Sequence, residues 1–368
     1  MTDPIARQVE RVQRLMHAGG IDLVALGPGV YLDWLLGFHP SPDERLSLLL
    51  IGRAGAIFVM PALNAADTQA RCKLPMVCWT DATGPDRALE TAIATATGSL
   101  PDIGRMSVDE TMRTDFTLAL LALFPQAEIV TARTLLGPER MVKTPEEYTK
   151  LKASAATADQ AMKQAMAALR PGMTEEEVAA IVRASFVHSG AMPVFAIIGA
   201  GANGAFPHHH TGPSVIRDGD AVVMDIGGRL EGYFSDMTRM AVIGTMPPDY
   251  MKVHDVVEQA VCAALAAARP GVAARVVDEA ARNVITRAGY GEYFVHRTGH
   301  GLGRTVHEDP YITGTSDTIL REGMVFSIEP GIYLPGRFGI RLEEIVFLRA
   351  DGPEILSVLP RAPFHVTA

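Results

Sequence analysis

Two segments of the 368-residue chain repeat one pattern at an offset of 104 residues. Residues 217–227 read RDGDAVVMDIG, and residues 321–331 read REGMVFSIEPG. The alignment pairs arginine with arginine and glycine with glycine, and it places Asp225 on Glu329 inside stretches whose apolar residues predict buried strands. A buried carboxylate is costly unless it is paired or bound to a metal. The repeat therefore predicts a duplicated fold with matching carboxylates in its interior.

Each copy of the pattern is followed by a second acidic residue. Asp236 comes 11 residues after Asp225, on a predicted strand over 233–239, and Glu343 comes 14 residues after Glu329, on a predicted strand over 340–347. Each carboxylate alone is explained by a salt bridge, for which the candidates are Arg239, Arg321 and Arg341. Four carboxylates at repeated positions favour a cage for two divalent cations.

The duplication extends upstream of the acidic strands. Residues 170–172 and 269–271 both read RPG, and each triplet follows an alanine-rich helical stretch and precedes a second one. The C-terminal part of the chain is therefore predicted to contain two helix–helix–strand–strand halves. We expect strand pairs from both halves to form one curved sheet with helices outside it, and the acidic residues to meet near the pseudo-twofold axis.

The length and the local pattern predict two domains, because 368 residues exceed the size at which one core usually keeps growing. Before residue 135 the chain alternates a predicted helix (8–16), a strand (22–26) and a hairpin (46–51 and 56–60). The sequence TPEE at 144–147 is typical of a capping box that opens a long helix ending near 169, and TEEE at 174–177 opens a second helix. We place the junction between 135 and 143, with domains 1–138 and 139–368, and predict an α/β (α+β) fold.

Composition excludes several classes of function. The net charge of −9, without any run rich in lysine and arginine, argues against a nucleic-acid partner. Residues 1–20 lack the apolar core of a signal peptide, and the apolar stretch 46–63 is interrupted by glycine and arginine, so no membrane span is expected. Three cysteines without paired spacing suit a reducing compartment, so a cytoplasmic location is the default prediction.

A histidine adds a nitrogen donor to the acidic set. His300 lies in the stretch TGHGLG at 298–303, where small neighbours allow close approach of backbone and ligand. Mixed Asp, Glu and His ligands suit Mn²⁺, Co²⁺ or Zn²⁺ better than an all-oxygen Ca²⁺ site. Two such ions about 3.5–4 Å apart can hold a bridging hydroxide and polarise a carbonyl group.

Further histidines are candidates for contact with a substrate. His307 is a candidate to bind a developing oxyanion, and His208 and His296 are candidates for substrate contact. We assign His209 and His210 to structural roles, because a lone histidine is more often a satisfied structural residue.

The segment 199–204, GAGANG, matches the dinucleotide-binding fingerprint and follows an apolar run. That fingerprint requires a helix that opens at its third glycine. Here Pro207 and Pro213 flank a run of three histidines, which makes a continued helix unfavourable. We therefore interpret the segment as a loop beside the site.

The ordered set of motifs resembles the metal-dependent proline-specific peptidases of the creatinase/methionine aminopeptidase superfamily, which have the pita-bread fold. The matching stretches are Pro207-His208, 225–227, 235–239, 299–303, 307–310, 328–333 and 341–344. Residues 31–32 and 36–38 resemble the creatinase-like N-terminal domain that the shorter methionine aminopeptidases lack.

The resemblance implies a role for each matching residue. Asp225, Asp236, His300, Glu329 and Glu343 would be the metal ligands, with Asp236 and Glu343 bridging two ions. Glu329 would relay a proton from the attacking hydroxide, and Arg341 would orient the carboxylates. The residues implied to hold the substrate are His208, His296, His307 and Tyr333. The resemblance also implies a homodimer activated by Mn²⁺ or Co²⁺, with Mn²⁺ as the first choice.

The predicted function is therefore hydrolysis of Xaa-Pro peptide bonds, as a dipeptidase (a prolidase). One alternative is an aminopeptidase that removes the residue before proline from longer peptides. An alternative of another class is a peptide-binding module that kept the fold and lost the chemistry; it predicts missing ligands, whereas all five are present in the sequence.

Overall fold

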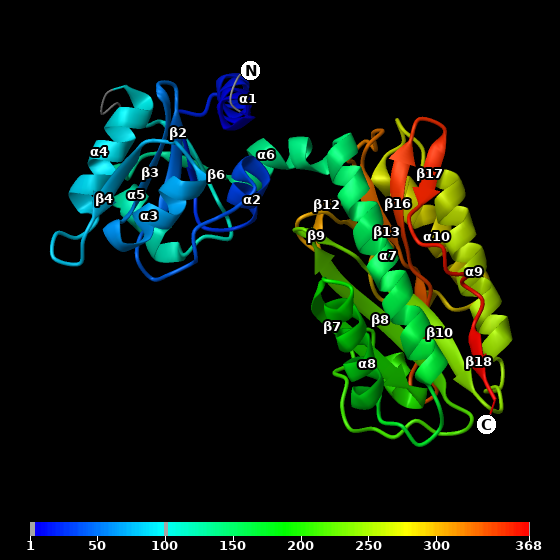
Figure 1. Cartoon of the computed structure of the whole chain (residues 1–368). Helices are drawn as coiled ribbons and strands as arrows, with labels where there is room; N and C mark the ends of the chain where they lie inside the picture. Colours follow the sequence, from blue (N-terminus) through cyan, green and yellow to red (C-terminus); the bar gives the residue numbers. More distant parts are fainter. Residues whose placement is uncertain (1–3, 99–101, 368) are drawn as a thin grey trace. The chain divides into compact units, whose positions relative to one another are not determined.

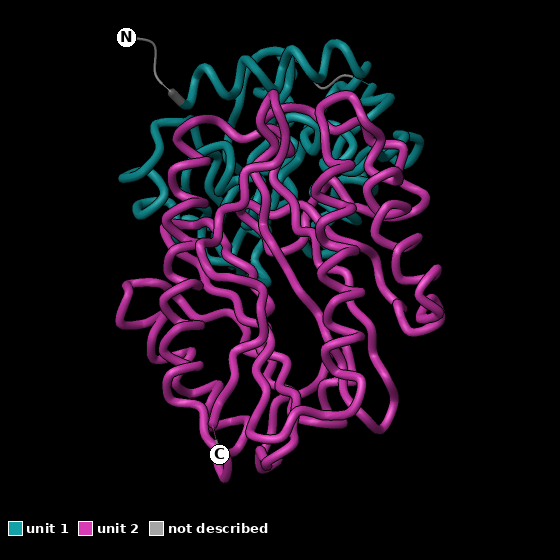
Figure 2. Tube along the Cα trace, turned by 90° about the vertical axis from the view of Figure 1, so that its right-hand side faces the viewer, with its two compact units in different colours: residues 1–140 teal, residues 141–368 magenta. Residues whose placement is uncertain are grey.

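The computed structural model describes residues 4–98 and 102–367. The chain divides into two compact units, Met1–Arg140 (unit 1) and Met141–Ala368 (unit 2), which Figure 2 colours separately. Each unit has its own hydrophobic core and is described by itself. None of the helices in the described residues is long and apolar enough to cross a lipid bilayer.

Unit 1 contains a six-stranded mixed sheet in the order β4-β3-β2-β1-β5-β6. The predicted hairpin is confirmed, since β2 and β3 are antiparallel and Gly52 lies opposite Gly55. The elements are α1 (Pro4–Gly19), β1 (Leu23–Leu26), α2 (Val30–Leu36), β2 (Leu48–Gly52), β3 (Gly55–Pro61), α3 (Ala62–Arg71), β4 (Met76–Trp79), α4 (Asp86–Thr97), β5 (Arg105–Val108), α5 (Thr114–Leu123), β6 (Glu128–Thr131) and α6 (Ala132–Met141).

Unit 2 opens with the two helices that the sequence predicts. Helix α7 (Pro145–Ala168) starts at a complete capping box, in which the Thr144 side chain accepts from Glu147 N and the Glu147 carboxylate accepts from Thr144 N. Helix α8 (Glu175–His188) repeats this arrangement with Thr174. Both caps satisfy backbone N–H groups that a helix leaves free in its first turn.

The remainder of unit 2 repeats a plan of helices packed on strands (Figure 1). Helices α7 and α8 pack on the strands of the first half of unit 2. Helices α9 and α10 lie side by side along the strands of the second half. The elements are β7 (Met192–Ala200), the 3₁₀ turn η1 (Gly201–Ala205), β8 (Ala221–Leu230), β9 (Tyr233–Phe234), β10 (Met237–Ile243), α9 (Tyr250–Ala267), α10 (Ala274–Arg287), η2 (Gly291–Tyr293), β11 (Gly299–Gly301), β12 (Glu308–Ile312), β13 (Val325–Ile328), β14 (Gly331–Leu334), β15 (Phe338–Arg341), β16 (Glu344–Arg349), β17 (Gly352–Ile355) and β18 (Phe364–Val366).

The expectation of one curved sheet is wrong in detail. The strands form two five-stranded sheets, one around β8 and β10 and one around β13 and β16, together with the β14–β15 hairpin. Between the sheets, Glu343 N donates to Thr238 O at 3.3 Å. The Arg239 guanidinium then donates to Thr238 O at 3.0 Å and to Glu343 O at 2.5 Å. The hydrogen bond between Glu343 and Thr238 and the buried Arg239 side chain therefore link the two sheets, which are not joined by a continuous ladder.

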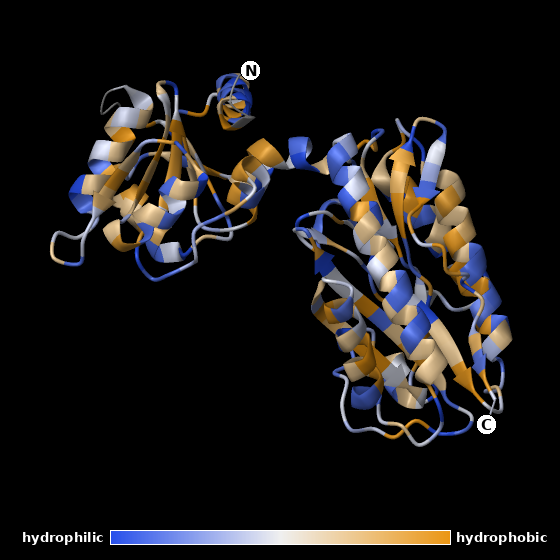
Figure 3. Cartoon of the chain, in the orientation of Figure 1, coloured by the Kyte–Doolittle hydropathy of each residue, from blue (hydrophilic) through white to orange (hydrophobic). Residues whose placement is uncertain are grey.

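Strand β8 separates two hydrophobic clusters, as alternation predicts. Val222, Met224 and Ile226 belong to the cluster formed with α7 and α8, whereas Ala221 and Val223 belong to the cluster formed with α9 and α10. Figure 3 shows hydrophobic residues along β10 and β16, and both hydrophobic and hydrophilic residues along α7 and α9. The glycine-rich segment after β7 forms the five-residue turn η1, which confirms that no long helix opens there.

Candidate metal centre

Three of the four repeated carboxylates lie where a strand is interrupted. Asp236 lies between β9 and β10, and Glu343 lies between β15 and β16, so the predicted continuous strands over 233–239 and 340–347 are each broken at the acidic residue. Glu329 directly follows β13, and only Asp225 lies within a continuous strand, β8. A break releases the residue from the strict alternation of a strand, so its side chain can turn toward the space between the two sheets.

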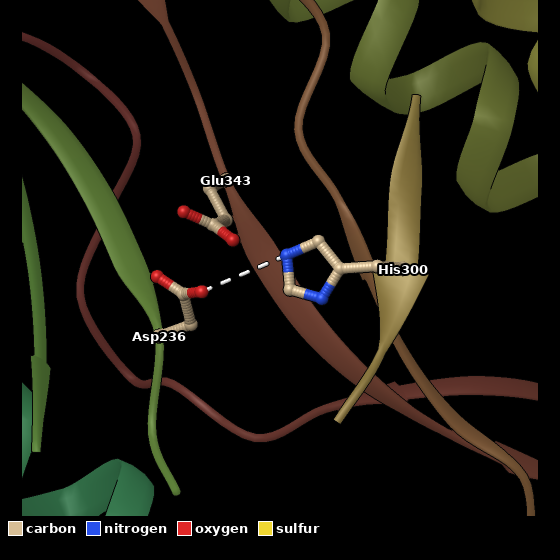
Figure 4. A group of neighbouring side chains, drawn as sticks. All are labelled: Asp236, His300 and Glu343. Carbon is tan, nitrogen blue, oxygen red and sulfur yellow. Dashed lines mark ion pairs between the residues drawn. The ribbon is translucent and has the colours of Figure 1, made fainter. Parts of the chain in front are cut away.

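The structure brings the five predicted ligands together. All of them line one cavity of about 580 Å³ in unit 2. Oxygen atoms of Asp236 and Glu343 and a ring nitrogen of His300 lie within 4.8 Å of one another (Figure 4). Figure 4 shows these three side chains pointing toward a common centre from three different segments of the chain. The convergence predicted from the duplication is therefore present.

His300 presents one ring nitrogen to the acidic cluster. Its Nδ1 lies 3.1 Å from the carbonyl oxygen of Gly301 and donates a hydrogen bond there, and its backbone N–H donates to Ser327 Oγ at 2.9 Å. Its Nε2 then lies 3.2 Å from Glu329 Oε1 and 3.7 Å from Asp236 Oδ2. A backbone acceptor on one imidazole nitrogen is the usual way to orient the other nitrogen toward a metal.

Two further side chains hold the carboxylates in place. Arg341 Nη2 donates to Asp225 Oδ2 at 2.5 Å, so the salt bridge considered for this residue does form. Thr238 Oγ1 donates to Glu343 Oε2 at 2.8 Å and accepts from Arg341 Nε at 3.1 Å. Two carboxylate oxygens, Asp225 Oδ1 and Glu343 Oε1, are buried without a hydrogen-bond partner. Such oxygens are costly in a protein interior unless they bind a cation.

The charges of the acidic cluster are not balanced by protein groups alone. Burial, followed by repulsion from Glu343, Asp225 and Glu329, raises the pKa of Asp236 well above its ordinary value. Burial and repulsion from Glu329 and Asp225 raise the pKa of Glu343 in the same way. Burial also raises the pKa of Asp225, against the attraction of Arg341. Crowded carboxylates of this kind ionise together only when a cation lies between them.

Glu329 behaves differently from the other three. Burial acts to raise its pKa, but its hydrogen bond with His300 and the charge of that ring outweigh burial and lower the pKa to about 2. Ser327 Oγ also donates to Glu329 Oε1 at 3.1 Å. The buried oxygens, the mutual repulsion and the nitrogen donor together fit divalent ions such as Mn²⁺, Co²⁺ or Zn²⁺.

The predicted substrate histidines line the same cavity. The rings of His300 and His307 have centroids 4.2 Å apart, and burial, with the charges of His300 and Arg297, lowers the pKa of His307 to about 4. Burial also lowers the pKa of His296. Both rings are therefore neutral at neutral pH. The single N–H group of a neutral His296 is Nδ1–H, which donates to the carbonyl oxygen of Arg297 at 2.7 Å, whereas His307 can donate its N–H group to a substrate.

Tyr333 lies behind the cavity-lining residues. Its hydroxyl group lies 2.7 Å from His296 Nε2 and accepts from Arg341 Nη1 at 2.8 Å. The side chain is buried, and it is not among the residues that line the cavity. The structure thus places Tyr333 between two residues of the site.

Sequence reasoning missed two supporting residues. Thr238 joins Glu343 to Arg341, and the buried Glu175 accepts hydrogen bonds from Ala200 N at 2.9 Å and Asn203 Nδ2 at 2.8 Å. Glu175 also pairs with His209 Nε2 at 2.8 Å, which agrees with a structural role for His209. Thr238 carried a signal in the sequence, since it follows Asp236 by two residues, but Glu175 looked like an ordinary first-turn acid.

The fold and the site define a metallopeptidase with a duplicated catalytic unit. The chain belongs to metallopeptidase family M24, whose model matches residues 149–350, and residues 8–142 match the creatinase/prolidase N-terminal domain. The resemblance found in the motifs is thereby confirmed.

The comparisons include relatives that match along almost the whole chain. "Probable dipeptidase PepE" of Mycobacterium bovis is 39% identical over 96% of this chain and 95% of its own length. "Xaa-Pro dipeptidase" of Lactobacillus helveticus is 32% identical over 94% of this chain and 95% of its own length. The crystal structure of dipeptidase PepE from Mycobacterium ulcerans is 35% identical, covers 99% of this chain and 98% of its own, and superposes with a TM-score of 0.93.

Proposed function

We propose that the protein is a dipeptidase that hydrolyses Xaa-Pro bonds with two divalent cations, of which Mn²⁺ is the first choice. The observation that carries the proposal is the convergence of Asp225, Asp236, His300, Glu329 and Glu343 on one cavity in a member of family M24. Relatives named Xaa-Pro dipeptidase support the choice of substrate. When bound, two such ions lower the pKa of a shared water and polarise the scissile carbonyl group.

The residues around the cluster supply the other parts of the reaction. Glu329 lies at the cavity wall with a low pKa, so it is ionised at neutral pH and can take a proton from the attacking water at Oε1 or Oε2. The leaving group is the proline nitrogen, which must gain a proton as the bond breaks. The same carboxyl group, once protonated, is placed to supply that proton.

The neutral ring of His307 suits the binding of a developing negative charge. His307, with a pKa of about 4, donates a hydrogen bond from an uncharged ring over the pH range in which Glu329 is ionised. Preorganised donors of this kind stabilise a tetrahedral intermediate without reorganising at the moment of reaction. His208 and His296 line the same cavity, and Tyr333 fixes the orientation of His296.

A substrate-length series with metal reconstitution tests the proposal. We expect the Mn²⁺-loaded enzyme to cleave Xaa-Pro dipeptides with higher kcat/KM than Xaa-Pro-Yaa tripeptides, and to cleave neither Xaa-Ala nor Xaa-Gly at comparable rates. Faster cleavage of the tripeptides would assign the aminopeptidase function instead. A protein that binds no divalent ion and cleaves none of these peptides would be the non-catalytic binding module. The homodimer and the cytoplasmic location remain predictions from the sequence.

A further inference from the structure

The loop that carries His307 is held by a buried ion pair outside the metal cluster. Residues 302–307 join β11 to β12, and Glu308, the residue after His307, pairs with β11 at the base of the loop. The Glu308 carboxylate forms an ion pair with Lys143 Nζ through Oε1 and accepts from Thr305 Oγ1 at 2.9 Å through Oε2. The side chains of Lys143 and Glu308 are 2% and 8% exposed, so solvent screens this contact little.

Lys143 is itself fixed in the first residues of unit 2. Its backbone N–H donates to the carbonyl oxygen of Gly323 at 2.8 Å, and Val142 forms an isolated bridge with Met324 just before β13. The next residue, Thr144, is the cap of α7. The lysine side chain therefore extends toward the loop from backbone that is anchored on both sides.

Gly303 leaves the space that the ion pair fills. A methyl group on this residue would lie 2.6 Å from Glu308 Oε1, 3.0 Å from Lys143 Nζ and 3.1 Å from Lys143 Cε. The carbonyl oxygen of Gly303 also accepts from Phe234 N at 2.9 Å. The ion pair is thus packed directly against the backbone of the loop, so the position of the pair and the position of the loop depend on each other.

The ring of His307 has little else to hold it. In the part of the chain that the structure describes, its nitrogens have no hydrogen-bond partner, and the ring packs edge-to-face on His300. His296, in contrast, has hydrogen-bond partners at both ring nitrogens. A ring without hydrogen bonds to the protein takes its position from the backbone that carries it, so whatever fixes this loop also places His307.

We propose that Lys143 is a positioning residue of the cavity, whose buried ion pair with Glu308 holds His307 where it binds the developing negative charge. This inference rests on the proposed function and adds to it a residue that does not line the cavity. A buried ion pair contributes little net stability compared with apolar residues of similar volume, but its two charges are satisfied in one geometry only. That restriction suits a loop that must hold one ring in place.

The first test is a double-mutant cycle between Lys143 and His307 in the Mn²⁺-loaded enzyme. Lys143→Met is expected to lower kcat on an Xaa-Pro dipeptide by about 10- to 100-fold with little change in KM, because a misplaced donor loses its interaction with the transition state. His307→Ala removes the donor altogether, so adding Lys143→Met to it should lower kcat no further.

Two results of this cycle would overturn the proposal. A fall in kcat of the same size with and without His307 would show that Lys143 acts on the fold or the metal site as a whole. An unchanged kcat for the single Lys143→Met variant would show that the ion pair does not place the ring.

Two further variants keep the test decisive if Lys143→Met does not fold. Combining Lys143→Met with Glu308→Gln removes both charges of the pair, and the loss of kcat should be the same. Gly303→Ala keeps both charges but displaces the pair from the loop, and its loss of kcat should also disappear in the His307→Ala background. Wild-type activity in both variants would contradict the proposal.

The matched control is Lys152→Met, because Lys152 lies on α7 in an exposed ion pair with Glu354. It should leave kcat and KM unchanged, both alone and with His307→Ala.

A measurement of hydrogen exchange keeps the test independent of turnover. Leu302 N and Gly303 N donate hydrogen bonds within and beside the loop. Mass spectrometry of the Mn²⁺-loaded protein should show that Lys143→Met raises the exchange rate of the backbone amides in 302–308, and that Lys152→Met does not. Unchanged exchange in these residues would contradict the proposal. Failure of the wild type to cleave any Xaa-Pro peptide would instead refute the proposed function, and the exchange result would then decide by itself whether Lys143 holds the loop.

Discussion

The two halves of unit 2 place equivalent carboxylates in different surroundings. In the first half, Asp225 lies within the continuous strand β8 and accepts a hydrogen bond from Arg341, a residue of the second half. In the second half, Glu329 follows the end of β13 and contacts His300 from its own half. Gene duplication thus fixes where the acids are, whereas the partners that set their charge have diverged. The pKa of Asp225 is raised by burial, whereas that of its counterpart Glu329 is lowered by its contact with His300.

The second pair of acids, in contrast, has kept its symmetry. Asp236 and Glu343 both lie in short breaks between strands, and both have raised pKa values because of burial and neighbouring carboxylates. Equivalent surroundings suit equivalent roles, so these two are the best candidates to bridge the ions. All but the last of the following predictions test either the symmetric pair, Asp236 and Glu343, or the divergent pair, Asp225 and Glu329.

The largest effect is expected from removing one member of the symmetric pair. Glu343→Gln and Asp236→Asn should each lower kcat/KM by at least about 10³-fold, because the change removes a ligand from both ions. Metal content, measured by plasma emission spectrometry, should fall with activity. If the two variants differ strongly from each other, the symmetry of the pair is refuted.

Breaking the divergent pair should affect stability as well as activity. Arg341→Met leaves the Asp225 carboxylate buried and uncompensated, which is expected to cost about 3–5 kcal/mol in the free energy of unfolding of the metal-free protein. Urea denaturation measures it. Arg337→Met, which removes an exposed ion pair with Asp249, is the control and should cost at most about 1 kcal/mol. A similar small loss for both variants would show that Asp225 does not depend on Arg341.

The symmetric pair also predicts the pH dependence of the metal-free protein. Because the folded state raises the pKa of Asp236 and Glu343 above 3.8 and 4.5, it binds their protons more tightly than the unfolded state does. The stabilising contribution is complete below these values and is lost as the pH rises through the raised pKa values. Thermal unfolding after chelation should therefore show a Tm that increases on mild acidification, until other groups titrate.

Two controls belong to the pH experiment. Loading with Mn²⁺ should weaken this increase, since the ions replace the protons. The Glu343→Gln substitution should reduce the increase in Tm of the metal-free protein. A Tm of the chelated wild type that falls steadily from neutral pH downward would contradict the crowding of the carboxylates.

The smallest effect concerns the loop that carries His208. Glu175→Gln replaces a buried carboxylate that accepts from two backbone N–H groups and pairs with His209, and it should cost about 1–3 kcal/mol in stability. We expect KM to rise more than kcat falls, because the loop carries His208, which lines the cavity and is a candidate for substrate contact. Glu176→Gln is the neighbouring control, since Glu176 forms an exposed pair with Arg183. Equal effects of the two substitutions on stability and KM would show that Glu175 does not anchor the loop.

Much of the site could be predicted from the sequence, because its information is local and repeated. The offset copies located four acids, and the small residues around His300 identified the nitrogen donor. The capping boxes at Thr144 and Thr174 placed both helices to within a residue or two.

The rest depends on contacts between distant segments. The two halves form two sheets that meet at Thr238 and Glu343, whose carbonyl groups both accept from the Arg239 side chain. Periodicity within a strand carries no information about such contacts.

The most direct test of the account is anomalous diffraction from crystals soaked in Mn²⁺. The account predicts two strong peaks about 3.5–4 Å apart, both within bonding distance of the symmetric pair Asp236 and Glu343. Asp225 should bind one ion, and His300 with Glu329 the other. A single peak, or peaks away from these residues, would contradict the claim that the duplicated acids hold a pair of cations.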